Sequence, residues 1–236
     1  METEQPELEQ QIASVAALGE PVRRSVYQTV SARAGWVSRD EAAEAVGISR
    51  SLAAFHLDKL VDGGLLEAGY ERRTGRTGPG AGRPSKIYRR SQRQFAINLP
   101  PRSYELAAHL LVRSVERLGS DEALEMLDAA AGEFGEHLAA EARLLAGPHA
   151  SEESMMQAAE ELLATYGYEP HHMPDGTIRL RNCPFHALAQ THRTVVCGMN
   201  HALMTGLVTG LGSAGIEAVL DPQPGLCCVA FRHKEP

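Results

Sequence analysis

Two short capped helices separated by a glycine turn constrain the fold of this chain more than any other feature. Ser38 followed by Glu41 forms a capping box, which predicts a helix that begins at Ser38 and ends near Gly47. Ser49 is an N-cap residue for a second helix, which ends at the glycine pair 63–64. Two helices joined by so short a turn are typical of a helix-turn-helix motif.

The segments on both sides of this helix pair predict a winged domain over residues 1–95. Two amphipathic helices are expected before the pair, and a strand, a glycine-rich basic loop and a returning strand are expected after it. These elements are predicted at 8–18, 21–30, 65–70, 72–83 and 86–90. Together they give the helix and strand order of a winged helix-turn-helix domain.

The second helix of the pair is expected to face a DNA major groove. Its apolar stripe is assigned to Leu52, Phe55, Leu57 and Leu60. Arginine can pair with guanine and serine is permissive, whereas a lysine further along the helix suits a phosphate. An alternative is that the arginine and lysine of this helix are ordinary solvated charges. The residues left off the stripe, which are the candidates for DNA contacts, are Ser49, Arg50, Ser51, Ala54, His56 and Lys59.

A cationic loop follows the helix pair. Between Glu71 and Arg93 there are eight basic residues and one acid, with four glycines interleaved. Such a loop can follow the phosphate backbone or enter the minor groove, although a merely solvated hairpin is the alternative. The predicted partner is double-stranded operator DNA, bound by a homodimer because paired half-sites require paired readers. Further DNA contacts are expected from Arg72, Arg73, Arg76, Arg83 and Lys86.

Charge divides the chain into two parts. Residues 20–95 hold fourteen lysines and arginines against eight acids, whereas residues 96–236 hold nine against eighteen. This asymmetry is typical of a nucleic-acid module joined to an acidic regulatory one, and the length suits two domains. No long apolar run predicts a membrane span, and no signal-peptide pattern opens the chain. We therefore expect a cytoplasmic protein without membrane contact.

The second half predicts an α+β sensor domain over 151–236, behind a helical linker and dimerisation region over 96–150. Two amphipathic helices are expected in the linker, at 106–118 and 124–145. The sensor domain is expected to contain a further helix, a hairpin that ends at a cysteine, a buried helix and two last strands. These elements are predicted at 155–166, 168–181, 201–211, 216–220 and 226–231.

All four cysteines lie in the last quarter of the chain, at Cys183, Cys197, Cys227 and Cys228. Soft thiolates select iron–sulfur clusters, zinc or copper, and gaps of thirteen and twenty-nine residues disfavour a zinc ribbon. The adjacent pair is expected in the last strand, where successive side chains point to opposite faces. Only one of the two should then reach a common centre.

Three cysteines leave a fourth ligand position open. The candidates are His186, His192, His201, a carboxylate or an exogenous thiol, although histidines in such places are more often satisfied polar groups. The alternative for all four cysteines is that they are small buried hydrophobes. Catalytic motifs such as a Walker loop, a nucleophile elbow or HExxH are absent from the sequence, so a thiol-dependent enzyme is a weaker interpretation than a regulator.

Several segments resemble a known family. LGEPVRRSVYQTV, SRSLAAFHLDKLVDGGLL and GRPSKIYRR resemble winged-helix bacterial repressors of the broad ArsR, DeoR and MarR-like kind. NCPFHALAQTHRTVVCGMNHALMTGLV followed by PQPGLCCVAF resembles the SufR-like subgroup, whose members hold an iron–sulfur cluster and repress operons for cluster assembly.

The resemblance implies a [2Fe–2S] or [4Fe–4S] cluster on Cys183, Cys197 and Cys227, with Cys228 as an extra thiol. It also implies a repressor whose operator affinity depends on the cluster. A winged-helix regulator that senses a mononuclear metal such as zinc, or a small organic effector, is the alternative.

Overall fold

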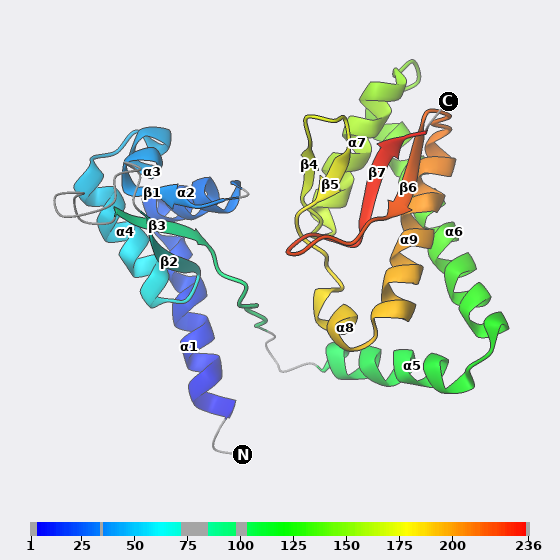
Figure 1. Ribbon diagram of the computed structural model, residues 1–236, viewed down its shortest axis with the longest axis horizontal. Helices are drawn as coiled ribbons and strands as arrows, with labels where there is room; N and C mark the ends of the chain where they lie inside the picture. Colours follow the sequence, from blue (N-terminus) through cyan, green and yellow to red (C-terminus); the bar gives the residue numbers. More distant parts are fainter. Residues whose placement is uncertain (1–3, 34, 72–84, 98–102, 235–236) are drawn as a thin grey trace, which may run out of the picture. The chain divides into compact units, whose positions relative to one another are not determined.

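The computed structural model describes residues 4–33, 35–71, 85–97 and 103–234 and divides into two compact units, Met1–Arg102 and Ser103–Pro236 (Figure 1). Each unit has its own hydrophobic core and its own antiparallel sheet. The expected mixture of helices and sheets is confirmed. Both helices of the predicted 96–150 linker belong to the second unit, and the dimerisation role of that region stays a prediction.

The first unit packs four helices against a three-stranded sheet of order β1-β3-β2. Val26 and Val30 of the second helix, Leu57 and Leu60 of the fourth, and Tyr88 of the last strand meet in its core. Its elements are α1 (Glu4–Ala16), the 3-10 turn η1 (Ala17–Gly19), α2 (Pro21–Ser31), β1 (Val37–Ser38), α3 (Arg39–Val46), α4 (Arg50–Asp62), β2 (Leu66–Glu71) and β3 (Ser85–Arg90).

Local capping fixes the helix pair α3 and α4 as the sequence predicts. The backbone N–H of Ser38 donates to Glu41 Oε2 at 2.7 Å, while the N–H of Glu41 donates to Ser38 Oγ at 3.3 Å. Gly47 ends α3 with φ of 72°, a left-handed conformation that glycine adopts without a Cβ clash. Ser49 Oγ then accepts from the N–H of Leu52 at 3.3 Å and starts α4. The predicted capping box is confirmed.

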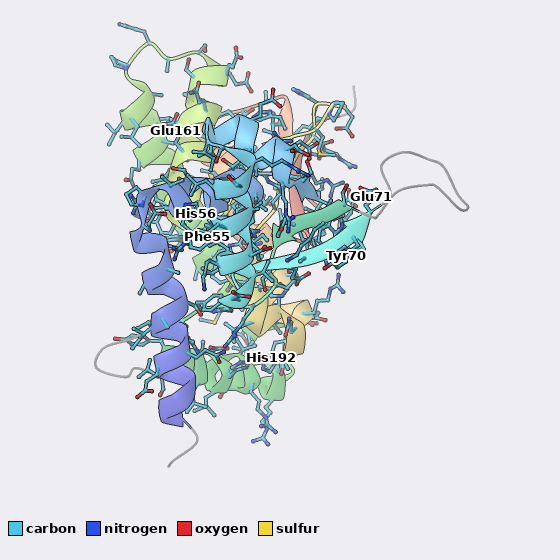
Figure 2. The ribbon with its side chains drawn as sticks, turned by 90° about the vertical axis from the view of Figure 1, so that its left-hand side faces the viewer. Phe55, His56, Tyr70, Glu71, Glu161 and His192 are labelled. Atoms are coloured by element: carbon cyan, nitrogen blue, oxygen red, sulfur yellow. The ribbon has the colours of Figure 1, made fainter. Side chains whose placement is uncertain are left out.

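Three residues of α4 do not have the burial that the sequence predicts. His56, expected to face outward, is buried at 5% exposure, whereas Phe55, expected in the core, is 52% exposed (Figure 2). Leu52 is exposed as well, so both inward assignments are wrong. The true buried stripe follows i, i+3, i+4, i+7 spacing, which suits one face of a helix, and consists of Ala53, His56, Leu57 and Leu60.

The second unit surrounds a four-stranded antiparallel sheet of order β4-β5-β7-β6. Its last strand begins at Val229, so the adjacent cysteines precede it and do not follow strand alternation, contrary to the prediction. Its elements are α5 (Tyr104–Leu118), α6 (Asp121–Ala146), α7 (Glu152–Thr165), β4 (Pro170–His172), β5 (Ile178–Leu180), α8 (His186–Thr191), α9 (Arg193–Leu211), β6 (Ile216–Leu220) and β7 (Val229–His233).

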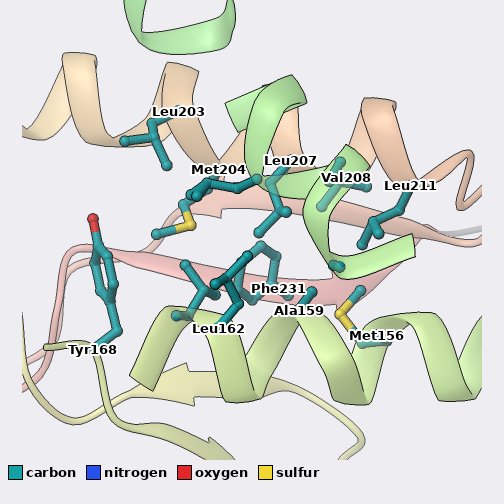
Figure 3. Packing of buried hydrophobic residues seen from close by; sticks show 14 of the residues in the cluster. Met156, Ala159, Leu162, Tyr168, Leu203, Met204, Leu207, Val208, Leu211 and Phe231 are labelled. Carbon is teal, nitrogen blue, oxygen red and sulfur yellow. The ribbon is translucent and has the colours of Figure 1, made fainter. Parts of the chain in front are cut away.

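Helix α9 is the central element of this unit's core. Figure 3 shows Met204 and Leu207 of α9 facing Leu162 of α7, with Phe231 of β7 between them. In the described part of the chain, α9 is the one helix long and apolar enough by length and composition to cross a membrane, and 50% of that window is buried inside the unit. Its apolar character is accounted for by this packing.

Glycines bring α6 and α9 into close contact. A Cβ placed on Gly135 of α6 would clash with the backbone carbonyl of Leu203, and one on Gly206 of α9 would clash with the carbonyl of Gly132. The two backbones therefore touch over this stretch without side chains between them. We call the pair Gly135 and Gly206 the glycine seam.

Candidate DNA-binding surface and thiol pocket

The exposed face of α4 carries polar, basic and apolar side chains together. Ser51, Leu52, Phe55 and Lys59 are exposed along this face, and Ala54 is half-buried beside it. Of the predicted DNA contacts on α4, the structure therefore places all except His56 at or near the surface. Phe55 was missed because an aromatic residue was assigned to the core by type alone.

His56 ties α4 to the start of α2. Arg23 Nε lies 3.4 Å from His56 Nδ1, and Glu20 Oε2 lies 3.5 Å from the same nitrogen. Glu20 also caps α2 by accepting from the N–H groups of Val22 and Arg23, and the hydrogen bond from Arg23 lowers the pKa of its carboxyl group. His56 therefore holds α4 against the start of α2 and lies behind the exposed face of α4.

Arg50 at the start of α4 is paired with an acid of the preceding helix. Arg50 Nε lies 2.6 Å from Asp40 Oδ1, and both side chains are about two-thirds exposed. An exposed pair of this kind contributes about 0–1 kcal/mol because water screens it. Asp40 therefore holds the Arg50 side chain only weakly.

Lys86, predicted to contact DNA, points back into the unit. Its Nζ lies 2.6 Å from Asp58 Oδ1, which also accepts from the Tyr88 hydroxyl at 2.8 Å. Partial burial raises the pKa of Asp58, but the hydrogen bonds from Lys86 and Tyr88 outweigh burial and lower that pKa below its usual value. The pair fastens β3 to α4 and does not leave Lys86 free for a phosphate. The predicted contacts Arg72, Arg73, Arg76 and Arg83 lie outside the described residues.

The comparisons with known proteins bear on this unit. A protein-family model described as a helix-turn-helix domain matches residues 18–68. The N-terminal unit carries a helix-turn-helix domain. The match spans α2, β1, α3, α4 and the start of β2, and it supports a DNA-binding transcriptional regulator rather than an enzyme. No curated protein and no solved structure matches the chain.

In the second unit, the four cysteines come together from three segments. Cys183 precedes α8, Cys197 lies on α9, and Cys227 and Cys228 lie between β6 and β7. All four line one cavity of about 260 Å³, which we call the thiol pocket. Its lining also includes His186, Gln190 and Arg193.

Hydrogen bonds connect the thiols of this pocket to one another. Cys183 and Cys228 both donate to Cys227, and Cys228 also contacts Cys197. Asn200 Nδ2 donates to Cys227 Sγ at 3.3 Å, and Asn200 Oδ1 accepts from the Tyr168 hydroxyl at 2.6 Å. The donors lower the pKa of the Cys227 thiol, and the same contacts raise the pKa of the Cys183 and Cys228 thiols.

Strand alternation led us to predict that Cys228 faces away from the other thiols, but its side chain lines the same pocket. The backbone enters β7 only after this residue, so both side chains of the adjacent pair reach the same pocket. Within the described ranges, no three His, Cys, Asp or Glu side chains are grouped to hold a single metal ion.

The three histidines considered as a fourth ligand have separate partners. His186 lines the thiol pocket and bonds to Gln190 at 2.9 Å. His201 Nε2 lies 3.0 Å from the carbonyl oxygen of Ala218, outside the pocket. His192 Nδ1 bonds to Glu116 Oε1 of α5 at 2.9 Å, at the junction of α8 and α9.

A second, larger cavity of about 780 Å³ lies elsewhere in this unit, between α7 and the sheet. Its lining includes the apolar side chains of Met156, Ile178 and Phe231. Glu160 Oε2 bonds to His172 Nε2 at 2.9 Å in the same lining. No local signal in the sequence predicts this cavity, because its walls come from segments far apart in the chain.

Proposed function

We propose that this chain is a DNA-binding transcriptional repressor whose operator affinity depends on an iron–sulfur cluster held in the thiol pocket. The observation that carries the proposal is the convergence of four thiols from three segments on one cavity of a protein with a helix-turn-helix domain. The resemblance of the cysteine segments to SufR-like repressors points in the same direction.

The donor set of the pocket fits a cluster better than a single ion. Iron–sulfur clusters are held by cysteine thiolates, commonly four of them, at the corners of a group several ångströms wide. Four thiols that line one cavity of about 260 Å³ suit that arrangement, whereas one zinc ion needs its ligands gathered about 2.3 Å from one point, a grouping not found among the described residues. We therefore assign Cys183, Cys197, Cys227 and Cys228 as the ligands.

The residues of the chain have separate roles around such a cluster. Asn200 donates to the sulfur of Cys227 and favours its thiolate form, and Arg193 adds a positive charge to the pocket lining. A bound cluster would supply a group that responds to oxidants and to iron supply. The thiols would hold it, and their geometry would change when it is lost.

A route from the pocket toward the DNA-binding unit runs through α5. Helix α8 lies between Cys183 and Cys197, and His192 at its end bonds to Glu116 on α5. Helix α5 in turn begins at Tyr104, close to the boundary between the two units. A rearrangement of the thiols would therefore move α5, and holo and apo states would bind DNA with different affinity.

We further propose that the functional form is a homodimer. None of the α5 side chains is buried, and the helix exposes a row of apolar residues on one side, Tyr104, Leu110, Leu111 and Leu118. A helix-turn-helix protein that reads two half-sites needs two copies of its reading head. Pairing of α5 with its counterpart would cover this row.

Anaerobic purification followed by absorption spectroscopy and by iron and sulfide analysis tests the proposal. We expect brown protein with iron and sulfide, and we expect chelator treatment to weaken operator binding at fixed salt. A variant with all four cysteines replaced by serine is the control, because it should remain colourless and bind DNA like the chelated protein. Colourless wild-type protein, or equal operator affinity with and without the cluster, would contradict the proposal.

A regulator that binds a small organic effector is the second candidate. The cavity of about 780 Å³ favours it, because its size and mixed apolar and polar lining suit a small organic molecule. This candidate predicts that Gln157→Trp, which adds a large side chain at an exposed position of the cavity lining, abolishes the response to effector in extracts while the four-serine variant retains it. The cluster proposal predicts the opposite pattern.

A further inference from the structure

Two apolar side chains of α4, Leu52 and Phe55, are exposed in the described part of the first unit. Phe55 is 52% exposed and Leu52 is 40% exposed, one helical turn apart on the same face. Water solvates such side chains poorly, and either position would accept a polar residue without loss to the core. Lys59, one helical turn after Phe55, is also exposed and adds a positive charge beside it.

The ring of Phe55 is also held in place. It packs edge-on against the ring of His56 with centroids 5.3 Å apart (Figure 2). His56 is buried and fixed by its contacts with Glu20 and Arg23. An exposed side chain that is already ordered loses less conformational entropy on binding than a free one. Phe55 is therefore pre-positioned for a contact outside the unit.

We propose that Phe55 reads the C5-methyl group of a thymine in the major groove, which makes it a sequence-specificity residue. The inference rests on the proposed DNA-binding function. The thymine methyl is the apolar group that base edges present in the major groove, and phenylalanine is one of the side chains that contact it. The second helix of a helix-turn-helix enters that groove, and the positive charge beside Phe55 matches the phosphates on its rims.

Thymine-to-uracil replacement isolates this contact, because uracil lacks only the methyl group. Preferred binding sites are first selected from random DNA with the full-length protein, and each thymine of the best site is then replaced singly. For wild type we expect about a fourfold loss of affinity at one position of each half-site, the value of one buried methyl group. Phe55→Ala should bind the thymine and uracil sites equally at that position.

Tyr70→Ala is the matched control, because Tyr70 is an exposed aromatic residue on β2 and not on α4. It should keep the wild-type uracil penalty, and Phe55→Leu should keep part of it. Wild-type protein without any preferred sequence would overturn the proposed function and this inference together. A preferred sequence with the same uracil penalty in wild type and Phe55→Ala would overturn this inference alone.

Discussion

Under the predicted contact of Arg50 with DNA, Asp40 would compete with DNA for this side chain and limit the affinity of α4. We expect Asp40→Asn to tighten operator binding several-fold, because it frees Arg50 and removes a negative charge near the phosphates. Arg50→Ala should lose discrimination at one base pair by about 1–3 kcal/mol. Fluorescence anisotropy at fixed salt measures both effects.

Glu44→Gln is the control for Asp40→Asn, because Glu44 is an exposed acid on α3, the helix that carries Asp40. It should tighten binding less than Asp40→Asn. Equal gains from the two variants would mean that overall charge matters and the Arg50 contact does not.

The position of Cys228 leads to a second expectation at the scale of single residues. Because its side chain lies in the thiol pocket and contacts Cys197 and Cys227, Cys228→Ser should lose iron and sulfide as fully as Cys197→Ser. Iron and sulfide content per chain after anaerobic purification measures this. A Cys228→Ser protein that keeps a wild-type spectrum would restore the three-cysteine assignment implied by the family resemblance.

At the scale of elements, the Asp58 contacts join β3 to α4 and make the first unit sensitive to acid. The pKa of Asp58 is lowered in the folded protein, so its stabilising effect is complete above the unfolded value of about 4 and is lost as the pH falls below it. We expect a loss of under about 1 kcal/mol, because Asp58 is partly exposed.

Urea unfolding followed by the fluorescence of Trp36 measures this loss, since Trp36 is the one tryptophan of the chain and lies in the first unit. Asp58→Asn should be less stable at neutral pH and less sensitive to acid. An unchanged acid dependence in this variant would assign the effect to other carboxylates, such as Glu20.

The glycine seam sets the distance between α6 and α9. Gly206→Ala should destabilise the second unit by about 1–3 kcal/mol, because its Cβ would clash with backbone that cannot move aside as a side chain does. Gly198→Ala on the same helix has room for a Cβ and should be neutral or more stable. Thermal unfolding of the apo protein compares the two. Similar losses of stability in both variants would mean that any alanine on α9 is destabilising and that the contact with α6 is not the cause.

Signals within a few residues predicted the elements better than they predicted the site. The capping box at Ser38 and the cap at Ser49 are local, so sequence alone places α3 and α4. The apolar run before Val229 reads as strand from Leu226, but the register with β6 begins at Val229 and that with β5 at Ala230, while the N–H of Cys227 donates to the carbonyl of Leu180. That pairing, which brings Cys228 into the pocket, depends on distant segments and has no local signal.

The proposed regulation requires the whole molecule to pass the state of the thiol pocket to its DNA-binding unit, and a variant of Glu116 tests the route. We expect Glu116→Gln to incorporate the cluster normally but to lose most of the affinity difference between holo and apo protein, which is usually about 1–3 kcal/mol for such coupling. Operator titrations of both states measure it. Glu125→Gln, an exposed acid on α6, is the control and should couple like wild type. If Glu116→Gln kept the wild-type difference in operator affinity between holo and apo protein, the route would not run through Glu116.

The contact of two backbones at the glycine seam has a mechanical consequence. Side chains between helices act as a soft layer that absorbs small shifts by changing rotamer, but α6 and α9 lack that layer where Gly135 faces the backbone of Leu203 and Gly206 faces the backbone of Gly132. We therefore expect α6 and α9 to move together as one rigid body. With 26 residues, α6 is about 39 Å long, so a small tilt at the cysteine end of α9 becomes a displacement of several ångströms at the far end.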